Sequence, residues 1–398
     1  MADCHLSPSS PQPAERLINP LRHQTIAAAR SVVVKVGTRV LADEGGRLDL
    51  RRIELLSQQV CRIADAGRQL VLVSSGAVGA GVGKLGLATR PAGLAQLQAV
   101  AAIGQADLIQ AYERSLAGRG RHAAQVLLTA NDLRRRDAYL HVRNALTQIH
   151  AYGAIPIVNE NDSTAVGELM TTFGDNDSLA ASVAGLLADA LLVILSDVDG
   201  LHDGPPEHPE SRRVPLVRSL TPAIFELARD RTSTSSKGGM ASKLRAAQTA
   251  TSHGQATIIA PGRVDDVLDR VFAGQDIGTL FLPSARQVRG RRRWIGSAAR
   301  TEGGLHLDDG AARAIRERDG SLLAIGIRAV SGDFARGAVV SMCGPDGQEI
   351  ARGLSNYPSE EVERILGLPS DQIAGVLGHR PYEVVVHRNN LVLCQNHR

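Results

Sequence analysis

At 398 residues, the chain is longer than one hydrophobic core usually organises, so we expect two or three domains, one large and one small. A composition of 43% hydrophobic and 22% charged residues excludes a disordered or fibrous chain. Aromatic residues make up only 3%, which argues against a stacking surface for single-stranded nucleic acid, and a net charge of +4 is too dilute to identify a partner.

The first 30 residues contain four prolines among small polar residues and lack the apolar stretch of a secretory signal. We therefore interpret residues 1–30 as a disordered leader. The longest apolar run, at 183–195, is interrupted by Asp189 and is too short to cross a bilayer. These features favour a cytoplasmic protein without a membrane segment.

From residue 31 onward, short β-branched runs alternate with longer segments of helical period. This alternation predicts an α/β domain over residues 31–278, built as an open, mostly parallel sheet flanked by helices. A helix is predicted over 49–66, because apolar residues recur on one face and Gly67 stands where a left-handed cap is needed. The predicted strands are 31–36, 69–74, 123–128, 154–158, 190–195 and 256–259.

Near Gly278 the helical pattern stops. Residues 279–302, which become basic and glycine-containing, are predicted to be a linker, and residues 303–398 a small, mostly β domain. Its predicted strands are 322–330, 338–342 and 383–393, separated by turn signals.

The ends of the predicted strands hold the candidate site, because ligands of a doubly wound sheet gather at the carboxyl ends of its strands. The first strand places Lys35 in an apolar run followed by Gly37. A lysine at a sheet edge would simply extend its ammonium to water. On a central, covered strand the ammonium requires an anionic partner, and phosphate is a natural one.

The second strand runs into a glycine-rich loop at 74–83, whose N–H groups suit an anion. It also contains Gly81-x-Gly83-x-x-Gly86, a formal match to a dinucleotide fingerprint. The match is weak, because it lies several residues after the strand and no acidic residue ends a following strand about 20 positions later. Leu85 after Lys84, where Ser or Thr is required, excludes a Walker P-loop.

Two polar clusters follow, at 159–162 and 174–177. Helix capping explains one residue of the second cluster. The closely spaced carboxylates could bind a metal, orient ammonium groups or hold a substrate amine, and their spacing does not choose among these.

The strand at 190–195 ends in Ser196 and Asp197, and residues 237–243 form a Gly-Gly turn leading into a helix that holds Lys243 in its first turn. Such a turn presents free N–H groups and a positive dipole end to a phosphate. Two lysines, two glycine-rich turns and an acidic cluster together supply what phosphoryl transfer needs.

These residues resemble the amino acid kinase family, and within it the branch that phosphorylates glutamate. The resemblance covers nearly the whole chain from about Val32, and residues 303–386 resemble a PUA domain. The shared motifs are Val-Val-Lys-Val-Gly-Thr at 33–38, Ser-Ser-Gly-Ala at 74–77, Ile-Val-Asn-Glu-Asn-Asp at 157–162, Phe-Gly-Asp-Asn-Asp at 173–177 and Gly-Gly-Met-Ala-Ser-Lys at 238–243.

The resemblance implies ATP-dependent phosphorylation of the side-chain carboxylate of L-glutamate, the first step of proline biosynthesis. It implies that Lys35 and Lys243 stabilise the transferring phosphoryl group and that Asp177 organises the two ammonium groups. The implied glutamate-binding residues are Ser75, Asp162 and Asn176. The implied nucleotide-binding residues are Lys35, Ser196, Asp197, Lys237, Gly238, Gly239, Met240, Ala241, Ser242 and Lys243.

Mg²⁺ is expected to arrive on the phosphates of ATP, with no metal site formed by the protein itself. The resemblance further implies a homo-oligomer, proline as a feedback inhibitor, and a separate glutamyl phosphate reductase that receives the labile product. The chain departs from the family at Ser236-Lys237, where Gly-Thr is usual. We hypothesise that Lys237 supplies charge to the nucleotide in place of a hydroxyl.

Three alternatives stay open. A sister kinase could act on N-acetylglutamate, aspartate or a nucleoside monophosphate with the same fold. An RNA-binding protein is possible because PUA domains in other contexts bind RNA. A dinucleotide oxidoreductase is the third, and it rests on the single glycine match.

Overall fold

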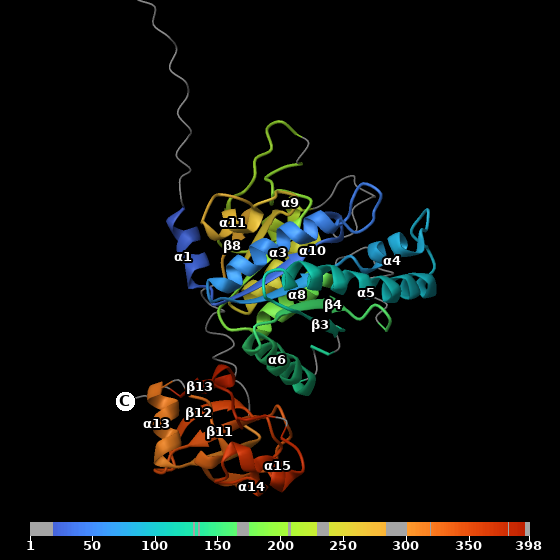
Figure 1. The fold of residues 1–398 in the computed structure, drawn as a ribbon. Coiled ribbons are helices and arrows are strands. Elements are labelled where there is room, and N and C mark those ends of the chain that lie inside the picture. Colours follow the sequence, from blue (N-terminus) through green and yellow to red (C-terminus); the bar gives the residue numbers. More distant parts are fainter. Residues whose placement is uncertain are drawn as a thin grey trace, which may run out of the picture.

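An eight-stranded sheet forms the centre of the larger, N-terminal part of the chain (Figure 1). The structure is a computed structural model, and it describes residues 19–129, 132–133, 136–164, 175–205, 208–228, 239–283, 301–318, 320–380 and 382–394. The strand order is β3-β4-β2-β1-β5-β7-β8-β6, with only the β7–β8 pair antiparallel. The strands are β1 Ser31–Val36, β2 Gln69–Ser74, β3 Ala123–Leu128, β4 Ile155–Glu160, β5 Ala190–Ser196, β6 Leu216–Val217, β7 Ala256–Pro261 and β8 Thr279–Phe281.

Strand β1 lies in the middle of this sheet. It pairs in parallel with β2 on one side and β5 on the other, and all six of its residues are buried. Val32 and Val34 pack into the core on one face of the sheet, while Val33 packs into the core on the other. Of the two settings considered for Lys35, the structure therefore shows the central, covered strand and not the sheet edge.

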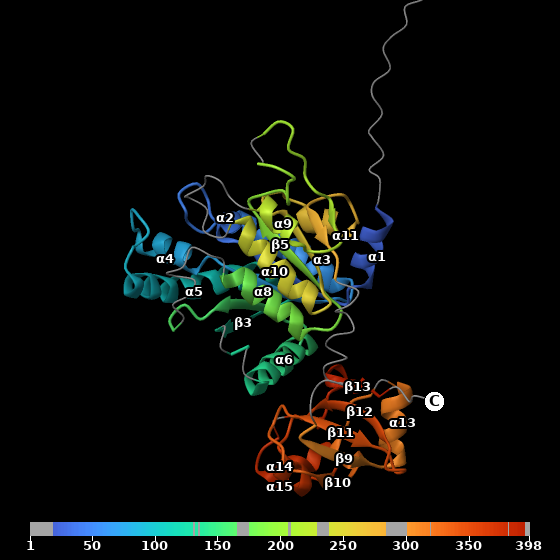
Figure 2. The same cartoon turned by 180° about the vertical axis from the view of Figure 1, so that it is seen from behind.

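Helices cover both faces of the sheet. Figure 1 views the face covered by α3, α5 and α11, and Figure 2 the face covered by α8 and α10. The helices of this part are α1 Pro20–Ala28, α2 Thr38–Leu41, α3 Leu50–Asp65, α4 Ala77–Leu85, α5 Leu94–Ala117, α6 Arg136–Ala151, α8 Asp175–Leu186, α9 Pro222–Leu227, α10 Met240–Ser252 and α11 Val267–Phe272.

Helix α3 matches the helix predicted from apolar periodicity. Asp49 caps it by accepting a hydrogen bond from the Arg52 N–H group at 3.0 Å. Gly67 follows the helix with a φ of 82°, the left-handed conformation that glycine adopts without strain.

Residues 20–28 differ from the expected disordered leader, since they form helix α1. Asn19 caps the helix, Pro20 fits its first turn, and Ile26 joins the core of the sheet. The buried Arg22 contacts the turn that precedes β8. Most of the predicted leader lies outside the described residues.

Strand β8 also differs from its expected place, because it falls in the stretch predicted to be a linker. It pairs with β7 and β6, and its Phe281 is fully buried. Its three residues are too few to show a periodic pattern. The rest of the predicted linker, at 284–300, lies outside the described residues.

The C-terminal part has a sheet of its own, in the order β10-β9-β11-β12-β13, and a separate hydrophobic core. Three short helices, which the sequence pattern does not reveal, cover this sheet. Within the predicted strand 322–330, residues 324–326 form a 3₁₀ turn and the strand starts only at Ile327. Of the predicted strand 383–393, only the last three residues form a strand. The elements are β9 Gly303–Leu307, α13 Asp309–Arg318, β10 Ile327–Ser331, β11 Val339–Cys343, β12 Glu349–Leu354, α14 Ser359–Arg364, α15 Ile373–Leu377 and β13 Leu391–Leu393.

This C-terminal domain lies against α6 in both views (Figures 1 and 2). Leu140 of α6 packs with Val339 and Leu354, and Arg143 approaches His387 at 3.3 Å. Burial lowers the pKa of His387 to about 4, and Arg143 adds to the effect. None of the described helices is long and apolar enough to span a membrane.

Candidate active site

Two lysines and one aspartate meet at the carboxyl ends of the central strands. Lys35 of β1 approaches Asp177 of α8 at 2.6 Å, and Lys243 of α10 lies 4.0 Å from the other carboxylate oxygen of Asp177. The three side chains are 9%, 1% and 7% exposed, respectively. The predicted organiser thus stands between the two predicted cations.

This triad carries one more positive than negative charge in a buried setting. Burial lowers the pKa of the Lys243 ammonium, Asp177 opposes that effect, and Lys35 adds to it. Ser242 donates a hydrogen bond to Asp177 at 3.2 Å, which fixes the carboxylate. A surplus cation kept out of water is stabilised by an anion, so the triad suits a phosphoryl group.

Helix α10 presents its N-terminus at the same place. Gly239 is its N-cap, Met240 and Ala241 stand in its first turn, and Lys243 is its fourth residue. The free N–H groups and the dipole of a 13-residue helix favour a phosphate there. Of the predicted nucleotide-binding residues, Lys237 and Gly238 lie outside the described residues.

Of the remaining predicted nucleotide-binding residues, Ser196 is the last residue of β5 and Asp197 follows it. Arg39, which the sequence reasoning missed, pairs with Asp197 at 2.7 Å. Burial raises the pKa of Asp197, but hydrogen bonds from Arg39 and Ser196 outweigh it and hold the pKa below its ordinary value. The only sequence signal for Arg39 is its place four residues after Lys35, beyond the end of the same strand.

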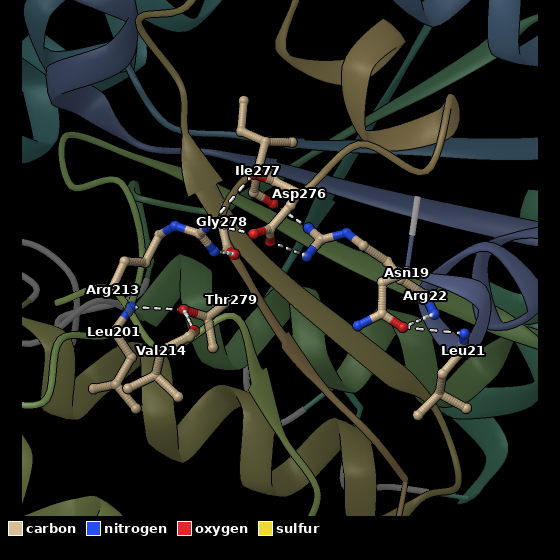
Figure 3. Close-up of polar contacts among 10 residues, drawn as sticks. All are labelled: Asn19, Leu21, Arg22, Leu201, Arg213, Val214, Asp276, Ile277, Gly278 and Thr279. Atoms are coloured by element: carbon tan, nitrogen blue, oxygen red, sulfur yellow. Dashed lines mark hydrogen bonds and ion pairs between the residues drawn. The ribbon is translucent and has the colours of Figure 1, made fainter. Parts of the chain in front are cut away.

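A polar network anchors the segment that follows β5 to the start of β8 (Figure 3). The Thr279 hydroxyl accepts a hydrogen bond from the Leu201 N–H group at 2.8 Å and donates one to the Val214 carbonyl at 2.7 Å. Arg213 pairs with Asp276 at 2.9 Å, and its guanidinium also bonds the backbone of the turn before β8.

Helix α1 reaches the same turn from the other side. The buried Arg22 donates to the Ile277 carbonyl and lies 3.5 Å from Asp276, so Asp276 is shared by two arginines (Figure 3). Burial lowers the pKa of Arg22 to about 10, while Asp276 opposes the shift. Residues far apart in the sequence thereby fix the turn before β8 and tie it to the segment that follows β5.

The predicted acceptor-binding residues gather at the ends of β2 and β4. Asn176 donates to the Ser75 hydroxyl oxygen at 2.9 Å and to the Asn159 carbonyl oxygen at 3.1 Å. All three side chains are buried. Asn159 belongs to the polar cluster seen in the sequence, but it was not among the predicted site residues.

Asp162 follows β4 in a turn. Burial raises the pKa of its carboxyl to about 6, and the nearby Arg90 opposes this shift. Burial thus disfavours the ionised carboxylate, which a cationic partner would stabilise.

The glycine motif at 81–86 has a packing role. Its residues lie in α4 or at its end, and a Cβ atom at Gly81 would stand 2.0 Å from the Val100 carbonyl oxygen of α5. The motif thus permits two helices to cross closely and forms no nucleotide loop after a strand, which removes the basis of the oxidoreductase alternative.

The fold and these constellations define an α/β protein whose buried cations suit phosphoryl transfer. The model of the amino acid kinase family matches residues 30–260, more than half of the chain, and the model of the PUA domain matches residues 303–377. The chain therefore belongs to the amino acid kinase family and carries a PUA domain.

Two curated relatives, both named glutamate 5-kinase, align over nearly the whole chain. One, from Rhodopirellula baltica, is 61% identical over 94% of this chain and 96% of its own length. Another, from Pseudomonas entomophila, is 44% identical over 92% of this chain and 99% of its own. A solved UMP kinase from Bacillus anthracis covers 64% of this chain and 97% of its own, with 14% identity and a TM-score of 0.44.

Proposed function

We propose that this chain is a glutamate 5-kinase, which transfers the γ-phosphoryl group of ATP to the side-chain carboxylate of L-glutamate and so begins proline biosynthesis. One observation carries the proposal: the buried Lys35, Asp177 and Lys243 stand together at the carboxyl ends of the central strands. The 61% identity with a relative of that name supports the choice of glutamate as acceptor.

In this reaction a carboxylate oxygen of glutamate attacks the γ-phosphorus, the bond to the β–γ bridging oxygen breaks, and ADP leaves. Lys35 and Lys243 stabilise the charge on the transferring group from two sides. Asp177 holds the two ammonium groups at fixed positions and offsets part of their mutual repulsion. No covalent intermediate with the protein is required.

ATP enters as its Mg²⁺ complex, because its phosphates need a divalent cation. Within the described residues, no group of three or more His, Cys, Asp or Glu side chains is placed to hold a metal ion. The oxygens of Asp177 face Lys35, Lys243 and Ser242, and Asp197 bonds Arg39, so cations and a hydroxyl engage these two carboxylates. We propose that the phosphates of the nucleotide bring the metal.

On the nucleotide side, Ser196, Asp197 and residues 237–243 would bind ATP. Lys237 would add positive charge where the family usually has a threonine. An unchanged KM for ATP in the Lys237→Ala variant would contradict that role.

On the acceptor side, Ser75 and Asn176 would hold a carboxylate of glutamate, and the ionised Asp162 would bind its ammonium. The hydrogen bond between Asn176 and Ser75 and the raised pKa of Asp162 support these roles.

A coupled assay of ADP release, run separately with glutamate, aspartate, N-acetylglutamate and UMP, tests the proposal. We expect turnover with glutamate at a kcat/KM at least roughly 100-fold above that of the other acceptors. Turnover with another acceptor and none with glutamate would refute the assignment and favour a sister kinase.

Several expectations drawn from the sequence stay predictions. They are the start of the second domain at 303, a cytoplasmic homo-oligomer, inhibition by proline, delivery of the product to a glutamyl phosphate reductase, and RNA binding by the PUA domain. Retention of RNA at physiological salt, lost when residues 280–398 are deleted, would support the last of these.

A further inference from the structure

A line of side-chain amides runs behind the proposed acceptor site. Gln105 of α5 accepts a hydrogen bond from the amide nitrogen of Asn159 at 2.9 Å. The carbonyl oxygen of Asn159 accepts from Asn176 at 3.1 Å, and Asn176 donates to the Ser75 oxygen at 2.9 Å. We call these four residues the amide relay. They come from α5, β4, α8 and the turn after β2, so the relay joins four parts of the fold.

The structure assigns a direction to each hydrogen bond of the relay. A side-chain amide has two N–H groups and one carbonyl, and the nitrogen of Asn176 gives its two protons to Ser75 and Asn159. The carbonyl of Asn159 therefore faces Asn176, and its nitrogen faces Gln105. Because the Ser75 oxygen already accepts, its own proton points to a different acceptor.

A reversed relay would have the opposite effect on the substrate. If Asn159 turned over, its nitrogen would face Asn176, and the Asn176 carbonyl would have to face both Asn159 and Ser75. The Ser75 proton would then be used inside the protein. The lone pairs of Ser75 would face an anionic carboxylate, which repels them. With the Gln105 amide oriented as it is here, its oxygen opposes this reversal, because it accepts from the nitrogen of Asn159.

We infer that Gln105 is a positioning residue for the acceptor: through Asn159 and Asn176, it keeps the Ser75 hydroxyl as a donor toward the substrate carboxylate. The inference rests on the proposed function, because it needs an anionic acceptor at Ser75. Gln105 acts through its neighbours and needs no contact with the substrate.

Close helix packing holds Gln105 at this place. The preceding residue is Gly104, and a Cβ atom there would stand 2.0 Å from the Ala77 carbonyl oxygen and 2.2 Å from the Gly81 nitrogen, both in α4. Only a glycine lets α5 approach so closely. Since α4 begins two residues after Ser75, this crossing ties the Gln105 end of the relay to the Ser75 end.

The test compares Gln105→Met, which keeps the length but removes the hydrogen-bond acceptor, with Gln110→Met, an exposed glutamine on the same helix. In Gln105→Met, we expect the KM for glutamate to rise roughly 3- to 10-fold, the effect of one neutral hydrogen bond, with the KM for ATP within about twofold of wild type. The rise in Tm caused by glutamate should shrink, while the rise caused by ATP persists and shows that the variant is folded. Gln110→Met should match wild type in both respects.

A double-mutant cycle with Ser75→Ala tests the route through the relay. If Gln105 acts by orienting Ser75, Gln105→Met should change the KM for glutamate less than about twofold in the Ser75→Ala background. If the effects of Gln105→Met and Ser75→Ala on the KM for glutamate multiply in the double variant, the inference is overturned. It is also overturned if the folded Gln105→Met variant has an unchanged KM for glutamate, or if its KM values for glutamate and ATP rise equally. A wild-type enzyme without turnover on glutamate would instead refute the proposed function. The cycle would then be run with the acidic acceptor that the wild type uses.

Discussion

The two halves of the site are built from different interactions. On the phosphoryl side, Lys35, Asp177 and Lys243 place full charges in a buried setting. On the acceptor side, neutral amides and a hydroxyl hold one another, and burial raises the pKa of Asp162 to about 6. The phosphoryl half supplies positive charge for the transferring group, whereas the acceptor half supplies hydrogen bonds of fixed direction for the substrate.

This difference sets the size of the effect expected from a substitution in each half. Removing one partner of a buried ion pair leaves the other charge without compensation, which is far more costly than losing a neutral hydrogen bond. We therefore expect changes on the phosphoryl side to act on kcat and on stability. Changes on the acceptor side should act on the KM for glutamate.

The largest effect is expected from Asp177→Asn. The substitution keeps the shape but leaves Lys35 and Lys243 facing each other without a carboxylate, so kcat should fall about 10²- to 10³-fold and the Tm should drop. Steady-state kinetics and thermal unfolding measure the two effects. The exposed Asp189→Asn is the matched control and should change neither. A kcat within threefold of wild type would show that the triad is not the phosphoryl site.

Gly104→Ala should have the next largest effect, because it forces α5 away from α4. Overpacking of this kind costs about 1–3 kcal/mol, and we expect a lower Tm together with a higher KM for glutamate as the amide relay is displaced. Gly118→Ala, at the end of the same helix, meets only ordinary contacts at 3.9 Å and serves as the control. If the Tm falls but the KM for glutamate does not change, the helix crossing does not position the acceptor half.

These two halves were not equally visible in the sequence. Lys35 stood out because an apolar run enclosed it, and the strand order confirmed that its strand is central. Lys243 and Asp177 stood beside glycines and other polar residues at the starts of helices. Each of these signals is local, so periodicity and helix-end patterns could reveal it.

The parts that escaped prediction depend on contacts between distant residues. Gln105 meets Asn159 from 54 positions away, and Arg22 meets Ile277 from 255 away. On their own helices, both are ordinary polar residues. Two of the helices in the C-terminal domain escape prediction for another reason, since α14 and α15, with 6 and 5 residues, are too short to show a helical period.

Asp162 gives the acceptor half its pH dependence. Its pKa is raised to about 6, so the carboxylate is ionised above that pH and loses its charge as the pH falls through it. Because only the ionised form attracts the ammonium of glutamate, the KM for glutamate should rise below pH 6, by up to about tenfold per pH unit, while the KM for ATP stays flat. Asp162→Asn should show a high KM for glutamate without this slope. A wild-type profile that is flat from pH 5 to pH 7 would contradict the role of Asp162.

The same shift has a consequence for stability. A carboxyl whose pKa is higher in the folded state than in the unfolded chain favours folding when protonated, and this contribution is lost as the pH rises through about 6. Asp162→Asn carries no charge at any pH. It should therefore unfold at a higher temperature than wild type at about pH 8, and the difference should shrink toward about pH 4. Equal unfolding temperatures at both pH values would show that the burial of Asp162 has no energetic cost.

The smallest effect is expected at Arg39, where the charged half reaches the surface. Arg39 is 49% exposed and its partner Asp197 is 33% exposed, so their ion pair is screened by water and salt. Arg39→Gln should raise the KM for ATP about two- to fourfold, because Asp197 loses the partner that orients it, and should leave the KM for glutamate unchanged. The KM for ATP of Arg39→Gln, divided by that of wild type, should move toward one as NaCl is raised from about 0.05 to about 0.5 M, because salt screens the ion pair. Arg51→Gln, a more exposed arginine with a looser pair at 3.9 Å, should show neither effect. A loss that persists at high salt would place Arg39 with the buried cations rather than at the edge of the site, and would extend the charged half as far as β5.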